Sequence, residues 1–133
     1  MIQDYNLRVY YEDTDAQGVV YYANYLKFFE RARTEFLRDS GYEQMQLMQE
    51  GMIFVVRRVD MILHGPARLD DNVKIKTELA KLGKVSFDFK QKAFVNSQLI
   101  TEASIKCGSL DSKSFKPSAL PEYLHSGMKK LLL

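Results

Sequence analysis

Residues 9–38 read VYYEDTDAQGVVYYANYLKFFERARTEFLR, and this stretch decides the fold. Polar and apolar residues alternate before it and into it, which predicts a half-buried strand over residues 5–11. The alternation stops at residues 13–18, DTDAQG, whose composition is that of a turn. Apolar residues then recur at helical spacing, so a long helix is expected to begin near Tyr22. The residues with this spacing are Tyr22, Tyr25, Leu26, Phe29, Ala32, Phe36 and Leu37.

The turn places a carboxylate, that of Asp15, just before the predicted helix. A helix start offers unpaired backbone amides and about half a positive charge to an anion. A carboxylate beside such an amide could attack or hydrolyse an acyl group. Taken by itself, Asp15 is better explained as an ordinary turn aspartate near a helix start, so only its wider sequence context favours a catalytic role.

Length and composition limit the remaining possibilities. The chain has 133 residues, which predicts one domain over residues 1–133. Its 19 basic and 17 acidic side chains give a net charge of +2, which is not the signature of a nucleic-acid-binding protein. The single cysteine, Cys107, cannot form an internal disulfide and is expected to be a packed side chain. With no apolar run of roughly 18 residues and no signal-peptide pattern at the N-terminus, we predict no integral membrane segment and a cytoplasmic location.

After the helix the chain is rich in strand patterns. Ser40 and Gly41 should end the long helix, and a short helix is expected over residues 43–50. A two-residue turn is predicted at Gly83–Lys84, and another short helix near the C-terminus. Further strands are expected over residues 52–63, 73–82, 85–95 and 100–110.

This order of elements predicts an α+β fold in which a five-stranded antiparallel sheet wraps around one long central helix. The helix should have about 18 residues and span roughly 27 Å. One sheet and one main helix leave apolar surface uncovered. We therefore expect a homo-oligomer, at least a homodimer, because association is the usual way to bury such surface.

The quoted stretch resembles the hot-dog-fold acyl-CoA thioesterases of the 4-hydroxybenzoyl-CoA thioesterase family, and most closely their YbgC-like bacterial branch. The segments FVVRRVDM (54–61) and PARLDD (66–71) extend the resemblance, which covers nearly the whole chain. It implies hydrolysis of an acyl-CoA to a free acid and coenzyme A, no cofactor, and an active site at a subunit interface in a homodimer or homotetramer. Asp15 matches the catalytic aspartate of the family. Tyr22 matches the residue whose backbone amide polarises the thioester carbonyl.

Two positions depart from the commonest pattern of this branch. Gln17 stands where glycine is usual, and Tyr22 stands where many members have histidine. Asp15 is expected to act as a general base or as a nucleophile, and the sequence does not separate these routes.

Four further residues are candidates for substrate binding: Gly18, Arg57, Arg58 and Lys84. Arg57 shares the strand parity of several apolar residues, so it needs either a structural ion pair, with Glu30 or Glu12, or an anionic ligand. Arg58 should point the other way and, with Lys84, is a candidate for holding the phosphates of coenzyme A.

Other functional classes are less well supported. The spacing of Asp13 and Asp15 imitates the start of a calcium loop, but Asn24 stands where that loop needs glutamate. His64 and His125 are far apart in the sequence, so neither zinc nor a histidine-dependent hot-dog dehydratase is favoured. A non-catalytic module on the same fold that binds acyl-CoA or an acyl carrier remains an alternative, although the presence of Asp15 argues against it.

Overall fold

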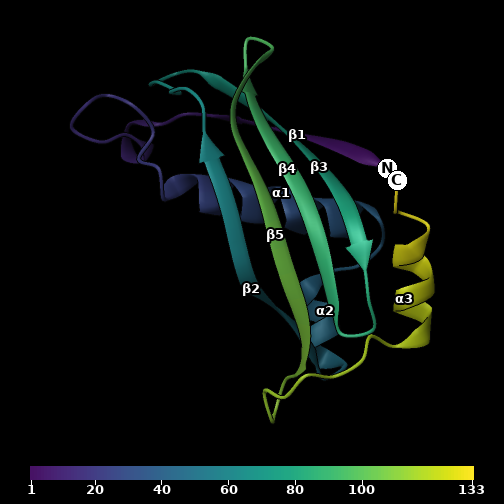
Figure 1. Cartoon of the computed structure of the whole chain (residues 1–133). Helices are drawn as coiled ribbons and strands as arrows, with labels where there is room; N and C mark the ends of the chain where they lie inside the picture. Colours follow the sequence, from purple (N-terminus) through teal and green to yellow (C-terminus); the bar gives the residue numbers. More distant parts are fainter.

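A computed structural model describes residues 1–133 and shows one curved sheet with a long helix lying across its inner face (Figure 1). All neighbouring strands are antiparallel, and their order is β1-β3-β4-β5-β2, so β1 and β2 form the two edges. The elements in chain order are β1 (Ile2–Arg8), a 3-10 turn (Tyr11–Asp13), α1 (Asn24–Asp39), α2 (Gln44–Gln49), β2 (Met52–Leu63), β3 (Asn72–Leu82), β4 (Ser86–Val95), β5 (Gln98–Asp111) and α3 (Glu122–Lys129).

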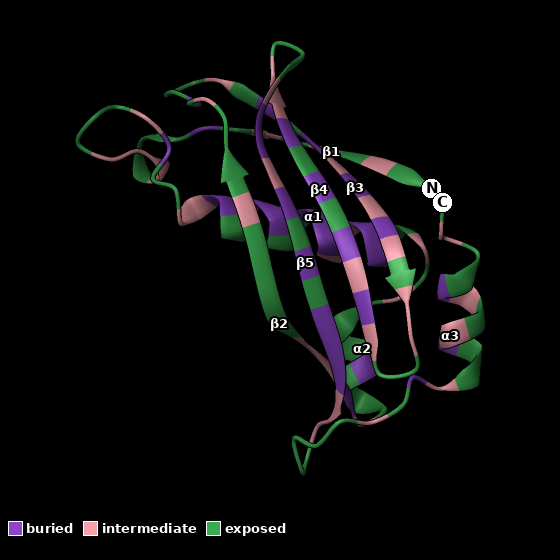
Figure 2. Cartoon of the chain, viewed as in Figure 1, coloured by how far each residue is buried: buried purple, intermediate pink, exposed green.

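The core lies between α1 and the inner face of the sheet. Buried and exposed residues alternate along the central strands, which is why those strands are striped in Figure 2. On β3 the predicted inner face is confirmed, because Val73, Ile75, Thr77 and Leu79 are all buried. Aromatic rings join the two layers; Phe36 of α1 meets Phe89 of β4 edge-to-face at a centroid distance of 5.6 Å.

The end of α1 confirms the predicted stop. Gly41 has φ +94° and donates its N–H to the carbonyl of Arg38, while Tyr42 donates to the carbonyl of Leu37. This pair of bonds is a Schellman cap, and its left-handed residue favours glycine. The start of the helix is later than predicted: α1 begins at Asn24, and the preceding residues form a tighter turn.

Two other boundaries differ from the sequence prediction. The first strand runs over Ile2–Arg8 rather than residues 5–11, because Val9 leaves the strand to exchange backbone hydrogen bonds with the segment that carries Asp70 and Asp71. The predicted two-residue turn at Gly83–Lys84 has three residues, since β4 begins at Ser86 and Gly83 donates to the Ser86 carbonyl.

Strand β2 has the predicted bounds but an irregular register. Its pairing with β5 shifts between Val56 and Arg58, so Arg57 occupies a β-bulge. The bulge reverses the alternation of side chains along β2. The prediction that Arg57 shares one face with the apolar residues before and after it is therefore wrong. Because β2 is an edge strand that α1 covers only partly, the apolar side chains of Val56, Val59 and Leu63 are exposed.

The longest helix, α1, has 16 residues. None of the helices combines the length and the apolar character that crossing a membrane requires.

Candidate functional site

The residues between β1 and α1 form a small hairpin that presents Asp15. Thr14 and Val20 pair as an isolated bridge, and the Asp15 N–H donates to the Val19 carbonyl at 2.9 Å. Gly18 closes the turn by donating its N–H to the Asp15 carbonyl at 3.0 Å. Its φ of +80° lies in the left-handed region, where glycine is the least strained residue, so Gly18 shapes the loop through its backbone.

The Asp15 carboxylate is half-buried and is held by the loop that it belongs to. Its Oδ1 accepts hydrogen bonds from the backbone N–H groups of Gln17 at 2.9 Å and Val19 at 3.4 Å. With its amide nitrogen turned toward the carboxylate, the Gln17 side chain also donates to both Asp15 oxygens at 3.3 Å. No basic side chain forms an ion pair with Asp15. The carboxylate is therefore oriented without being neutralised.

Tyr22 lies in the turn that leads into α1. The N–H of Asn24 donates to the carbonyl of Tyr21 at 2.8 Å, which makes Tyr22 the second residue of this turn. The N–H of Tyr25 in turn donates to the carbonyl of Tyr22, at 3.3 Å. The amide of Tyr22 itself donates to no acceptor in the protein, and the residue is exposed. A free amide therefore stands at the positive end of the helix, available to an oxygen atom from outside.

Further bonds fasten the hairpin to the start of the helix. The carbonyl of Asp13 accepts the N–H of Tyr21 and the side-chain amide of Asn24, both at 2.9 Å. From the other side, the Val20 N–H donates to the carbonyl of the buried Ala67 at 2.8 Å. Asp15 and the Tyr22 amide thus belong to one backbone unit that is connected by hydrogen bonds.

The remaining candidate residues are not gathered around Asp15. Arg57 is exposed at the bulge, and its side chain lies over Gly108 of β5. It forms no ion pair, so the predicted pairing with Glu30 or Glu12 is wrong; the bulge turns the side chain away from the core. Arg58 pairs with Asp60 at 3.0 Å on the exposed outer face.

Lys84 lies in the turn between β3 and β4, where its carbonyl accepts the N–H of Leu120 from the segment before α3. Figure 1 shows the loop before α1 at the opposite end of the sheet from this turn, so one chain does not bring Lys84 to Asp15. Cys107 is buried as expected, and this burial raises the pKa of its thiol to about 11.

The sequence analysis missed a buried polar group between α1 and the sheet. The guanidinium of Arg33 donates to Gln91 Oε1 at 3.0 Å, and Gln91 donates in turn to the carbonyl of Phe29 and to Thr77 Oγ1. The sequence does indicate that Arg33 is buried, because it stands four residues after Phe29 and three before Phe36, on the apolar side of the helix.

Comparison with known proteins agrees with this architecture. The family model described as "Thioesterase superfamily" matches residues 17–101, which include the second half of the hairpin, α1, β2, β3 and β4. The acyl-CoA thioester hydrolase YbgC of Escherichia coli O6:H1 is 44% identical over 126 residues, 93% of each chain. The acyl-CoA thioesterase YbgC of Haemophilus influenzae is 39% identical, over 94% of this chain and 93% of its own.

The similarity extends to solved structures. The crystal structure of a probable thioesterase from Bartonella henselae superposes with a TM-score of 0.85 at 36% identity, and covers 91% of this chain and 100% of its own. Sequence and structural relatives thus agree over nearly the full length of the chain. The protein belongs to the thioesterase superfamily, as a hot-dog-fold member of the YbgC-like acyl-CoA thioesterases.

Proposed function

We propose that this protein hydrolyses acyl-CoA to a free acid and coenzyme A, with Asp15 and the backbone amide of Tyr22 as the reacting groups of the site. The observation that carries the proposal is the free amide of Tyr22 at the start of α1, in the same backbone unit as an oriented, unpaired carboxylate. Membership of the YbgC-like branch supports a thioester as the substrate.

The amide supplies the electrostatic part of the mechanism. The thioester carbonyl oxygen accepts the Tyr22 N–H, and the helix dipole favours the negative charge that develops on that oxygen. The donor is already fixed by the turn, so little reorganisation is needed as the charge grows. The phenol of Tyr22 has no role in this step.

Asp15 supplies the chemical step by one of two routes. As a general base, the carboxylate removes a proton from a water molecule while the water oxygen attacks the carbonyl carbon; the C–S bond then breaks and the coenzyme A thiolate takes up a proton. As a nucleophile, a carboxylate oxygen forms a mixed anhydride, the thiolate leaves, and water hydrolyses the anhydride. Both routes need a negative charge at Asp15.

Release of coenzyme A tests this proposal directly. Free thiol would be measured with a chromogenic disulfide across a panel of short, long and aromatic acyl-CoAs. We expect turnover well above the rate without protein for at least one of these classes. Tight binding of acyl-CoA with no thiol release for any substrate would instead identify a non-catalytic binding module.

We also propose that two chains associate through the edge formed by β2. This edge leaves its backbone groups unpaired and exposes Val56, Val59 and Leu63, a combination that favours strand pairing with a second copy. Such pairing would bring Arg57 and Arg58 close to the neighbouring chain, where they are proposed to contact the substrate together with Lys84 and Gly18.

Sedimentation velocity would test the assembly. At micromolar concentration we expect a homodimer or a homotetramer of the 15.4 kDa chain, because an uncovered apolar edge favours self-association. A stable monomer that retains full thioesterase activity would contradict this prediction.

A further inference from the structure

Arg33 is a buried cation that forms no ion pair, although the carboxylate of Glu30 acts on it electrostatically. The residue lies on the sheet-facing side of α1 and is 8% exposed. One of its N–H groups donates to Gln91 Oε1 at 3.0 Å, and Arg33 takes part in none of the ion pairs of the structure. The other N–H groups of its guanidinium therefore have no protein acceptor within hydrogen-bond distance.

The guanidinium borders a cavity of about 110 Å³ between α1 and the inner face of the sheet. The apolar part of its wall consists of Leu37, Phe54, Val55, Val56, Phe87, Phe89 and Cys107. Arg33, Glu30 and Gln44 supply the polar part. Glu30 is exposed and accepts a hydrogen bond from Thr34 Oγ1 at 3.0 Å, so it belongs to the mouth of the cavity, whereas Arg33 belongs to its buried part.

A buried charge that forms no ion pair is unfavourable, because the charge loses part of its hydration. Burial accordingly lowers the pKa of Arg33, but a guanidinium stays charged at neutral pH. Gln91 offers it one neutral acceptor only. The remaining N–H groups of the planar guanidinium match the paired oxygens of a carboxylate or a phosphate, and of these two groups a carboxylate is the one that an acyl group can carry.

We propose that this cavity holds the far end of the substrate's acyl group and that Arg33 binds a carboxylate there. The substrates would be acyl-CoAs whose acyl group is a dicarboxylic acid joined to coenzyme A through one of its two carboxyl groups. The inference rests on the proposed function and adds the class of substrate. The apolar walls of the cavity accommodate the methylene chain, and the buried guanidinium of Arg33 binds the terminal carboxylate.

The position of Arg33 also bears on the length of that chain. Arg33 stands nine residues after Asn24, the first residue of α1, which corresponds to roughly 14 Å along the helix, and Tyr22 lies in the turn before Asn24. A carbonyl bound at Tyr22 and a carboxylate bound at Arg33 of the same chain would therefore be separated by a medium to long acyl group. A site shared between two chains would set a different length, so the test has to cover a series.

The test compares pairs of acyl-CoAs with equal numbers of carbon atoms, one ending in a methyl group and one in a carboxylate, from five to sixteen carbons. For the unaltered protein we expect kcat/KM to favour the carboxylate member by at least about tenfold at one length or more, as a charge-assisted hydrogen bond would provide. Arg33→Met should bring this ratio down to one or below. Arg33→Lys, which keeps the charge but loses the planar guanidinium, should give an intermediate ratio.

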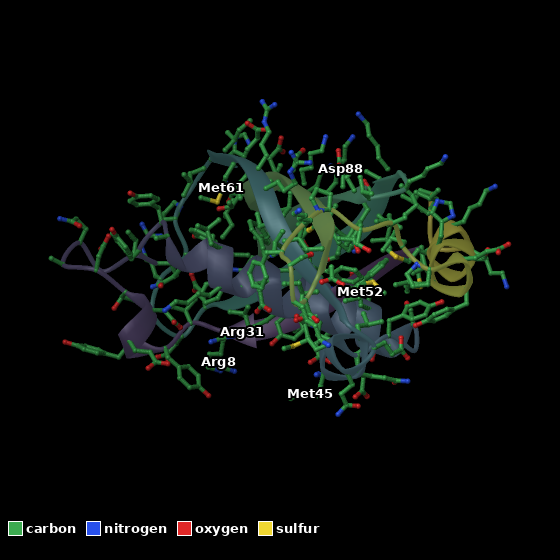
Figure 3. The ribbon with its side chains drawn as sticks, turned by 90° about the horizontal axis from the view of Figure 1, so that it is seen from below. Arg8, Arg31, Met45, Met52, Met61 and Asp88 are labelled. Atoms are coloured by element: carbon green, nitrogen blue, oxygen red, sulfur yellow. The ribbon has the colours of Figure 1, made fainter.

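Arg31→Met is the matched control, because it removes the same charge from the same helix. Figure 3 places Arg31 on the side of α1 away from Asp88 of the sheet, and the residue is exposed. This variant should keep the ratio of the unaltered protein. Circular dichroism melting would establish that each variant is folded.

Three results would overturn the inference. The first is an unaltered protein that hydrolyses the methyl-terminated member of every pair at least as well as the carboxylate member, a measurement that needs no variant to fold. The second is an unchanged ratio in a folded Arg33→Met protein, which would assign Arg33 to a structural role. Failure to hydrolyse any acyl-CoA at all would overturn the proposed function itself, and this inference with it.

Discussion

Asp15→Asn should lower thioesterase turnover at least about a hundredfold and leave the fold intact, because asparagine cannot take a proton or attack a thioester. The structure explains why the fold should survive. The Asp15 oxygen that accepts the amides of Gln17 and Val19 has an equivalent in the side-chain carbonyl of asparagine. The measurements are steady-state thiol release and the melting temperature of both proteins.

Asp13→Asn is the matched control, since Asp13 lies in the same loop but has a structural contact. Its Oδ2 accepts the backbone N–H of Tyr10 at 2.8 Å, a bond that asparagine can also accept. We expect this variant to retain most of the parental turnover. If Asp15→Asn were to hydrolyse acyl-CoA at nearly the parental rate, Asp15 would have to be reassigned as an ordinary turn residue.

Tyr22→Pro should raise the activation barrier by about 3 kcal/mol or more, because proline removes the N–H that is proposed to stabilise the oxyanion. The turn should tolerate this change. Tyr22 is the second residue of the turn closed by Asn24 and Tyr21, a position where proline is favoured, and its own N–H bonds to no protein acceptor. Turnover at saturating substrate and the melting temperature would be compared with those of the parent.

The side chain of Tyr22 provides the complementary test. Tyr22→Phe keeps the amide and removes the hydroxyl group, so most of the turnover should remain; Tyr22→His should also be active, since many members of the branch have histidine at this position. An inactive but folded Tyr22→Phe protein would show that the phenol takes part in the chemistry, and the amide assignment would then be withdrawn.

Local patterns in the sequence were sufficient for most of the secondary structure. The bounds of β2 were predicted correctly, because its apolar, β-branched run ends at the break of His64, Gly65 and Pro66. The alternation on β3 predicted its buried face, and Gly41 predicted the left-handed cap of α1. Each of these features depends on residues only a few positions apart, which is the range over which backbone and side-chain preferences act.

The proposal of Asp15 and Tyr22 as the reacting residues also came from the sequence, since both lie in one continuous stretch. Their arrangement needed the structure. The hairpin that presents Asp15 depends on the Val20 N–H bond to Ala67, and Ala67 lies 47 positions later in the chain.

The tertiary structure alone decided the strand order, which puts β1 beside β3 and leaves β2 at an edge. It also decided the bulge at Arg57 and the burial of Arg33 against Gln91, 58 residues away. The physical reason is the same in each case. Strand partners, bulges and buried polar contacts are set by which distant segments pack together, and the local periodicity of a sequence carries no information about that choice. The sequence by itself determined the family and most of the secondary-structure elements and led to the proposed reacting residues, whereas packing determined which edge strand stays unpaired and which charge is buried.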